Sequence, residues 1–107
     1  MVYTTEDLEI MFGGDDLDQL ETDPKFTAGW SSSIVKAYRK RMQIIRSALD
    51  ERDFYNWKSL RFAKLEGKRK HQHSMRLNDQ YRLILELLKG NPQGTVIKVI
   101  GIEDYHK

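Results

Sequence analysis

The stretch at residues 73–88, HSMRLNDQYRLILELL, decides the fold that this sequence predicts. Polar and apolar residues alternate over residues 73–77, which is the pattern of a half-buried strand. Residues 78–80, Asn-Asp-Gln, are typical of a turn. Residues 81–88 are rich in bulky apolar side chains and favour a second strand. We therefore expect a β-hairpin here.

Working outward, residues 90–94 form a second turn signal, GNPQG, and residues 95–100, TVIKVI, predict a third strand. These three strands predict a C-terminal antiparallel meander in a small twisted sheet. An N-terminal strand at residues 1–3 and helices between it and the meander complete an α+β fold. One domain spans residues 1–107.

The N-terminal half predicts two helices. Thr4 or Thr5 caps the first, whose buried face is Leu8, Met11 and Phe12, and Gly13-Gly14 ends it. Residues 15–27 are acidic and predict a loop with one helical turn at residues 16–20.

A longer helix follows at residues 33–51, capped within Ser31–Ser33. Its apolar residues recur at spacings of three and four, as on one face of an α-helix, and are Ile34, Tyr38, Met42, Ile45 and Leu49. The aromatic-rich stretch at residues 54–65 is expected to pack over the core. Trp30 and Trp57 are interpreted as packing residues rather than as platforms for nucleic-acid bases.

The net charge of +2 conceals an asymmetry along the chain. Residues 1–27 hold eight acidic residues and one lysine, whereas residues 36–76 hold thirteen basic and four acidic residues. A basic stretch of this density is typical of proteins with phosphate-bearing partners, although a solvated helix face has the same composition.

Several classes of protein are disfavoured. No apolar run approaches the ~20 residues of a membrane span, and the N-terminus lacks the pattern of a signal peptide. With no cysteine there is neither a disulfide framework nor a thiolate metal site. His71 and His73 lack a third ligand at a known spacing, so no metal or cofactor is expected. We expect a cytoplasmic protein.

The C-terminal residues Asp104, Tyr105 and His106 form the first candidate constellation. An imidazole beside a carboxylate can act as general acid or base near neutral pH, and a tyrosine can stack on a base. The alternative is a polar tail that frays into solvent. If the strand continues, Asp104 and His106 share a side and Tyr105 faces away.

A second constellation contains the cations Lys68, Arg69, Lys70, His71, His73 and Arg76, followed by Arg82. Cleavage of RNA by its 2′-hydroxyl group needs a base, an acid and stabilisation of charge at the phosphate. Fixed arginine and lysine side chains supply the last of these without a metal. The alternatives are an incidental basic loop and, for Arg82, a structural ion pair with an acid such as Asp104.

Residues 72–83, QHSMRLNDQYRL, resemble the block QHSIRVNDQWRL of the HigB toxins, the plasmid-maintenance killer proteins of the RelE/ParE superfamily. The ending at residues 103–106, EDYH, resembles their terminal V/E-D-Y-H. Residues 65–69 resemble their L-x-G-x-R turn. The resemblance covers about residues 60–106, and its motifs occur in the expected order.

This resemblance implies a RelE-like fold and a ribosome-dependent, metal-independent endoribonuclease that cleaves translated mRNA and arrests growth. It implies that Asp104, Tyr105, His106 and Arg82 are catalytic, with Arg82 at the scissile phosphate. The basic residues at 68–71, His73 and Arg76 would bind RNA and the ribosome. A helix-turn-helix antitoxin of the HigA type would be the partner, and operator DNA would be contacted only through that complex.

The chain departs from the pattern of the best-studied type of member at Glu66 and Asn78, where that type carries basic residues, and from many members at Tyr81, where they carry tryptophan. Two alternatives therefore stay open. One is a ParE-like poison of DNA gyrase, and the other is a catalytically inactive module that binds only its antitoxin. Both keep the fold, because fold does not determine function.

Overall fold

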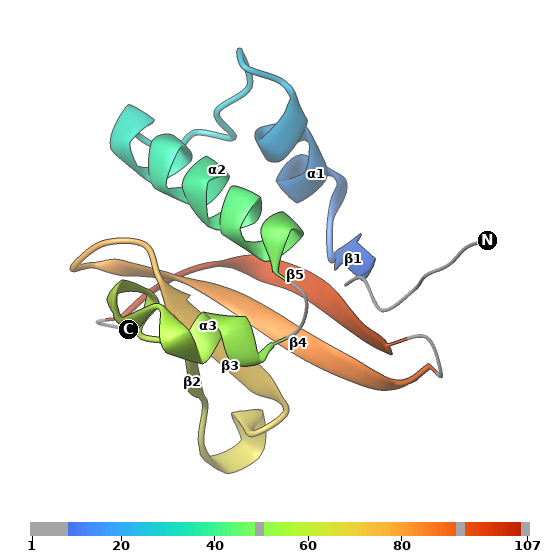
Figure 1. Cartoon of the computed structure of the whole chain (residues 1–107). Helices are drawn as coiled ribbons and strands as arrows, with labels where there is room; N and C mark the ends of the chain where they lie inside the picture. The colour runs from blue at the N-terminus through green and yellow to red at the C-terminus, as the bar shows by residue number, and fades with distance from the viewer. Residues whose placement is uncertain (1–8, 49–50, 92–93, 106–107) are drawn as a thin grey trace.

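A computed structural model of the chain describes residues 9–48, 51–91 and 94–105. The described elements are β1 (Glu9–Phe12), α1 (Asp15–Thr22), α2 (Ser32–Ser47), α3 (Arg52–Asn56), the 3-10 turn η1 (Lys58–Leu60), β2 (Ala63–Lys64), the 3-10 turn η2 (Gly67–Arg69), β3 (Gln72–Arg76), β4 (Tyr81–Asn91) and β5 (Gly94–Asp104). The strands form one mixed sheet in the order β1-β5-β4-β3-β2, with β1 parallel to β5 and the other pairs antiparallel. Figure 1 shows α1 and α2 together over one face of this sheet. The predicted α+β class and C-terminal meander are confirmed.

The hairpin of β3 and β4 has the register expected from its sequence, with Gln72 opposite Glu86 and Arg76 opposite Arg82. Asn78 holds the turn: its Oδ1 accepts hydrogen bonds from the backbone nitrogens of Gln80 at 2.8 Å and Tyr81 at 2.7 Å. Such a local bond between side chain and backbone is why asparagine favours turns. Asn78 therefore has a structural task in this turn.

Strand alternation divides the sheet into two faces. Because neighbouring residues point to opposite sides, Met75, Leu83 and Leu85 face the helices and are fully buried there. Val99, from β5, belongs to the same core cluster. The residues between them face the other way. That face carries most of the polar side chains of β3 and β4, together with the buried Ile84.

Helix α2 covers the apolar face. The hydroxyl oxygen of Ser31 accepts a hydrogen bond from the backbone nitrogen of Ile34 at 3.3 Å, which confirms the predicted serine cap. The predicted apolar face is buried over residues 34–45, whereas Leu49 lies outside the described residues. The helix ends at Ser47, earlier than expected. Within the described residues, no helix has the length and apolar character needed to span a membrane.

The acidic segment forms a full helix, α1, where a loop with one helical turn was expected. Leu17 and Leu20 are buried one turn apart, and Asp15, Asp16 and Asp18 occupy the first turn. Acidic residues there favour the positive end of the helix dipole. The spacing of Leu17 and Leu20 indicates a helix. The prediction of a loop missed this signal because it considered only the charge of the segment.

The prediction of a first helix that ends at Gly13-Gly14 is wrong for its second half, because residues 9–12 form the strand β1. Ile10 and Phe12 pack against the core while Glu9 and Met11 are exposed. Burial therefore alternates with a period of two residues, as in a strand. Gly13 continues the contact, since its nitrogen donates to the Val99 oxygen at 2.8 Å and a side chain there would crowd that oxygen. The expected strand at residues 1–3, the threonine caps and Leu8 lie outside the described residues.

Ion pairs and hydrogen bonds attach the acidic segment to α2. The guanidinium of Arg46 binds both carboxylate oxygens of Glu21, one of them at 2.7 Å. Arg39 donates from Nε to the backbone oxygen of Leu20 at 3.0 Å and from Nη2 to that of Asp23 at 2.8 Å. Part of the charge asymmetry along the sequence is therefore used inside the molecule, between α1 and α2.

The stretch at residues 54–65 packs over the core only in part. Phe54, Leu60 and Phe62 are buried, but the Trp57 side chain is exposed to 51%, so its interpretation as a packing residue is wrong. The other tryptophan, Trp30, does pack, with its ring edge-on to that of Tyr81 at 5.2 Å between centroids. The sequence alone did not separate the two tryptophans.

The hydroxyl group of Tyr38 gives a test of the attachment of α1. Tyr38 is fully buried, and its Oη donates to the backbone oxygen of Leu17 at 2.7 Å. Burial raises its pKa far above the ordinary value, so the phenol stays neutral. Tyr38→Phe leaves that carbonyl oxygen without its donor, and we expect the free energy of unfolding to fall by about 1–2 kcal/mol in urea denaturation.

The matched control is Tyr55→Phe, at a tyrosine that is half exposed. We expect a change below about 0.5 kcal/mol for this surface position. Equal losses in the two variants would show that the Tyr38 hydrogen bond does not hold α1 to α2.

Candidate active site

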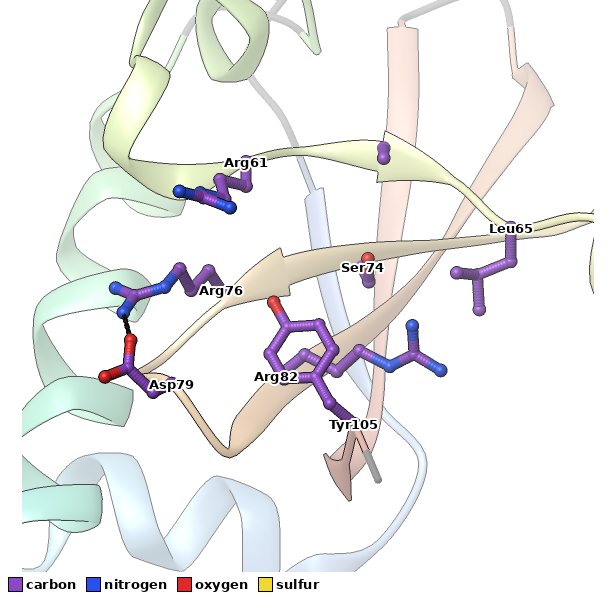
Figure 2. A pocket seen from close by; sticks show the side chains of 8 residues that line it. Arg61, Leu65, Ser74, Arg76, Asp79, Arg82 and Tyr105 are labelled. Carbon is purple, nitrogen blue, oxygen red and sulfur yellow. Dashed lines mark hydrogen bonds and ion pairs between the residues drawn. The ribbon is translucent and has the colours of Figure 1, made fainter. Parts of the chain in front are cut away.

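The polar face of the sheet carries a cavity of about 530 Å³. Ser74 and Arg76 of β3 and Arg82 of β4 line it because they alternate with the core residues of the same strands. The remaining lining residues are Arg61, Ala63, Leu65, Asp79 and Tyr105. Figure 2 shows Arg76 and Asp79 at one end of the cavity, Leu65 at the other, and the ring of Tyr105 in front of Arg82.

Glu103 of β5 is the acid that organises the cavity. Its carboxylate accepts two hydrogen bonds from the Arg69 guanidinium, both at 2.8 Å, and one from Nη2 of Arg82 at 2.7 Å. The Arg69 hydrogen bond lowers the pKa of Glu103 most, and the Arg82 hydrogen bond lowers it further. The carboxylate therefore stays charged and fixes Arg82 in place. The expected structural pairing of Arg82 exists, but its partner is Glu103 rather than Asp104.

Arg82 is held on a second side by an aromatic ring. Its guanidinium carbon lies 5.3 Å from the centre of the Tyr105 ring, within the range of a cation–π contact. The side chain is only 20% exposed, and its Nε is buried without a hydrogen-bond partner among the described residues. Buried donors without a partner are rare in native structures.

Arg76 forms the other cationic wall of the cavity. Its Nη2 pairs with the carboxylate of Asp79, and its backbone oxygen accepts a hydrogen bond from Nε of Arg41 in α2 at 2.7 Å. Burial lowers the pKa of Arg41, and the neighbouring Arg76 lowers it further. A second positive charge therefore lies close behind Arg76.

The C-terminal constellation is ordered as far as the structure describes it. Asp104 is the last residue of β5, and Tyr105 follows with its nitrogen donating to the Gln80 oxygen at 2.8 Å. The alternative of a fraying tail is therefore wrong for these two residues. Tyr105 lines the cavity, whereas Asp104 accepts a hydrogen bond from Nε2 of Gln80 at 3.1 Å and is not part of the lining. His106 lies outside the described residues.

The basic segment at residues 68–73 does not converge on the cavity. Lys68 and Lys70 are exposed. His71 lies 3.6 Å from a carboxylate oxygen of Glu86. His73 stacks on the Phe62 ring at 5.0 Å. The Arg69 guanidinium is engaged by Glu103. Of the predicted RNA-binding residues, only Arg76 lines the cavity.

Reasoning from sequence missed four polar or small lining residues: Arg61, Ala63, Ser74 and Asp79. The alternation of β3 could have indicated Ser74, because it lies two residues before Arg76 on the same face. Nothing in the local pattern indicated Arg61, which the turn η1 places at the cavity. Within the part of the chain that the structure describes, no three His, Asp or Glu residues form a group that could hold a metal.

The sequence matches a family model described as the RelE-like toxin of the type II toxin–antitoxin system HigB, over residues 7–100. This chain belongs to the HigB-like toxin family. The match includes the block at residues 72–83 and stops before Asp104. As a HigB-like toxin, the protein belongs to a type II toxin–antitoxin system, in which an antitoxin is its partner.

The fold of this HigB-like toxin is similar to that of a solved structure, the YoeB/ParE toxin from Agrobacterium tumefaciens, with a TM-score of 0.54. The match covers 91% of this chain and 98% of that one, at 12% sequence identity. At that identity the likeness shows the RelE-like fold alone. No curated protein matches the sequence.

The Glu103 carboxylate gives this toxin a pH-dependent contribution to stability. Its pKa is lowered in the folded protein, so the contribution is full above the ordinary glutamate range and is lost as pH falls through the folded-state pKa. We expect Glu103→Gln to destabilise the toxin at pH 7 and the difference from the native chain to shrink steadily below about pH 4.5. Urea denaturation at a series of pH values measures this.

Glu66→Gln is the matched control, because Glu66 is exposed. It removes the same charge, and we expect the stability curve of this variant to follow that of the native chain. A Glu103→Gln deficit that stays constant from pH 7 to pH 3 would contradict a role for the Glu103 charge.

Proposed function

We propose that this HigB-like toxin is a ribosome-dependent endoribonuclease of the cytoplasm, which cleaves translated mRNA without a metal and arrests growth. The observation that carries the proposal is the cavity in which Arg76, Arg82 and Tyr105 meet. Two guanidinium groups and an aromatic ring in one hollow fit a phosphate and its neighbouring base.

Arg82 is the residue suited to the scissile phosphate. Glu103 and the Tyr105 ring fix its guanidinium before any ligand binds. A preorganised cation stabilises the charge that develops on the phosphorus oxygens and needs no reorganisation during the reaction. Arg76, held by Asp79, adds positive charge at the same cavity.

The reaction that fits these groups begins with the 2′-hydroxyl oxygen of the RNA. A base removes its proton, and the oxygen then forms a bond to the adjacent phosphorus. The bond from phosphorus to the 5′-oxygen of the next nucleotide breaks, and an acid returns a proton to that oxygen. We assign this proton transfer to His106 and Asp104. Asp104 would act from the strand end beside Gln80, and Tyr105 would contact a base or the leaving group.

The exposed basic residues on and just after η2 suit the ribosome. Lys68 and Lys70 are exposed on and just after η2, and His71 is exposed next to them. Such side chains neutralise RNA phosphates without reading sequence. Arg69 would contribute indirectly, through Glu103, and His73 through its packing on Phe62. The partner in the resting state would be a HigA-like helix-turn-helix antitoxin, which would also carry the pair to operator DNA.

His106→Ala gives the direct test of the proposed chemistry. Removal of a proton-transfer group lowers rates by about 10²–10⁴-fold, so we expect the variant to lose both growth arrest and mRNA cleavage on induction. Primer extension on cellular mRNA measures the cleavage. Lys107→Ala, at the neighbouring residue, is the control and keeps both activities.

Two outcomes contradict the proposal. Growth arrest by His106→Ala at the native level would show that His106 is not catalytic. Intact mRNA together with a DNA-damage response, on induction of the native toxin, would identify a gyrase poison instead.

A further inference from the structure

Arg61 lines the cavity, although no motif in the sequence assigns it a role. It follows η1 and has a left-handed backbone, with φ 46° and ψ 45°. Its neighbours Leu60 and Phe62 are both buried in the core. These two anchors fix the backbone on either side, so the side chain of Arg61 is directed away from the core and towards the cavity.

The backbone of Arg61 is one that L-amino acids rarely adopt, and glycine adopts it without strain. Gly67, with a φ of 68°, shows glycine in that role elsewhere in this chain. Strained backbone at a non-glycine residue gathers at functional sites, where the side chain is what is needed. An arginine at this position, on the wall of a cavity, is therefore an observation that favours a task for its guanidinium.

The charges of the cavity indicate what that task is. Arg76 is paired with Asp79 and Arg82 with Glu103. Within the described residues, the guanidinium of Arg61 has neither a hydrogen bond nor an ion pair. Among the three arginines that line the cavity, Arg61 is therefore the one whose charge is not paired with an acid among the described residues. An anionic ligand would supply the missing partner.

We infer that Arg61 binds an RNA phosphate adjacent to the scissile one and so sets the position of the RNA strand in the cavity. Figure 2 shows Arg61 above Arg76, at the end of the cavity away from Leu65, whereas Arg82 extends towards that other end behind Tyr105. The cavity volume of about 530 Å³ is within the range of ~300–1,000 Å³ that ligand sites occupy. The placement of Arg82 at the scissile phosphate rests on the proposed function. The binding of a phosphate by Arg61 can be measured without assuming that function.

The test uses a short single-stranded RNA with 2′-O-methyl groups, which prevent attack by the 2′-oxygen. Its affinity for the purified toxin, separated from the antitoxin, is measured over a series of salt concentrations. A lost phosphate contact reduces the slope of log affinity against log salt by about 0.7 for a single strand. We expect this loss, with several-fold weaker binding at low salt, in Arg61→Gln and Arg61→Gly, and partial retention in Arg61→Lys.

Two controls separate binding from folding. Arg61→Gly relieves the left-handed backbone, so its melting temperature should equal or exceed that of the native toxin while its RNA binding falls. Lys64→Gln removes one exposed charge three residues away, beside Ala63 but outside the cavity lining. We expect its salt slope to equal that of the native toxin.

The inference is overturned if the Arg61→Gln and Arg61→Gly variants keep the native slope, or if the native toxin does not bind this RNA. Cleavage of mRNA on ribosomes distinguishes this failure from that of the proposed function. Suppose that the native toxin cuts mRNA and that the Arg61 variants reach half-maximal rate at the same concentration of mRNA-programmed ribosomes as the native toxin. This result refutes only the role of Arg61. A native toxin that does not cut, while its Arg61 variants lose the salt slope, refutes only the nuclease.

Discussion

The alternation of side chains along β3, β4 and β5 is the constraint on which the rest of the molecule depends. It directs Met75, Leu83 and Leu85 to the helices and leaves Arg76 and Arg82 on the opposite face. A slip of one residue in pairing would exchange the two faces. The core and the cavity therefore depend on the same strand register. A shift in that register would displace the side chains of both.

A single carboxylate then converts the polar face into a site. Glu103 comes from β5, Arg82 from β4 and Arg69 from η2, so the ion pairs join three separate elements. Long basic side chains usually sample many rotamers, and fixing one costs conformational entropy. Here that entropy is lost during folding rather than when a ligand binds. The same arrangement explains why Arg69, although basic and close in sequence to Lys68 and Lys70, differs from them in its contacts.

Charge is distributed in two ways in this chain. The acidic helix α1 neutralises part of α2, through Glu21 and Arg46, and it uses backbone oxygens to hold Arg39. On the other side of the sheet, Arg69 and Arg82 share the carboxylate of Glu103, Arg76 pairs with Asp79, and Lys68 and Lys70 are exposed. A sum of charges along the sequence cannot separate these cases, because it does not show which acid lies beside which base.

The sequence predicted best where one local pattern determined the structure. Residues 73–88 gave the hairpin, because alternation and the turn at Asn78 agree. Serine capping and apolar spacing likewise gave α2. The strand β1 was missed because four residues carry little pattern of their own and pair with β5, far along the chain. For the site, Arg82, Arg76 and Tyr105 were predicted to be functional and do line the cavity. Arg61 and the partner of Arg82 were missed because both depend on contacts between distant segments.

The measurement that tests the central claim most directly compares two mRNAs on purified ribosomes, which differ only at the nucleotide whose 2′-hydroxyl group is proposed to react. One carries the ordinary ribose there, and the other carries a single 2′-deoxyribose. Chemistry in this cavity through the 2′-hydroxyl group predicts that the toxin cuts the first mRNA and leaves the second intact at that position. Cleavage of both, or of neither, would contradict the account.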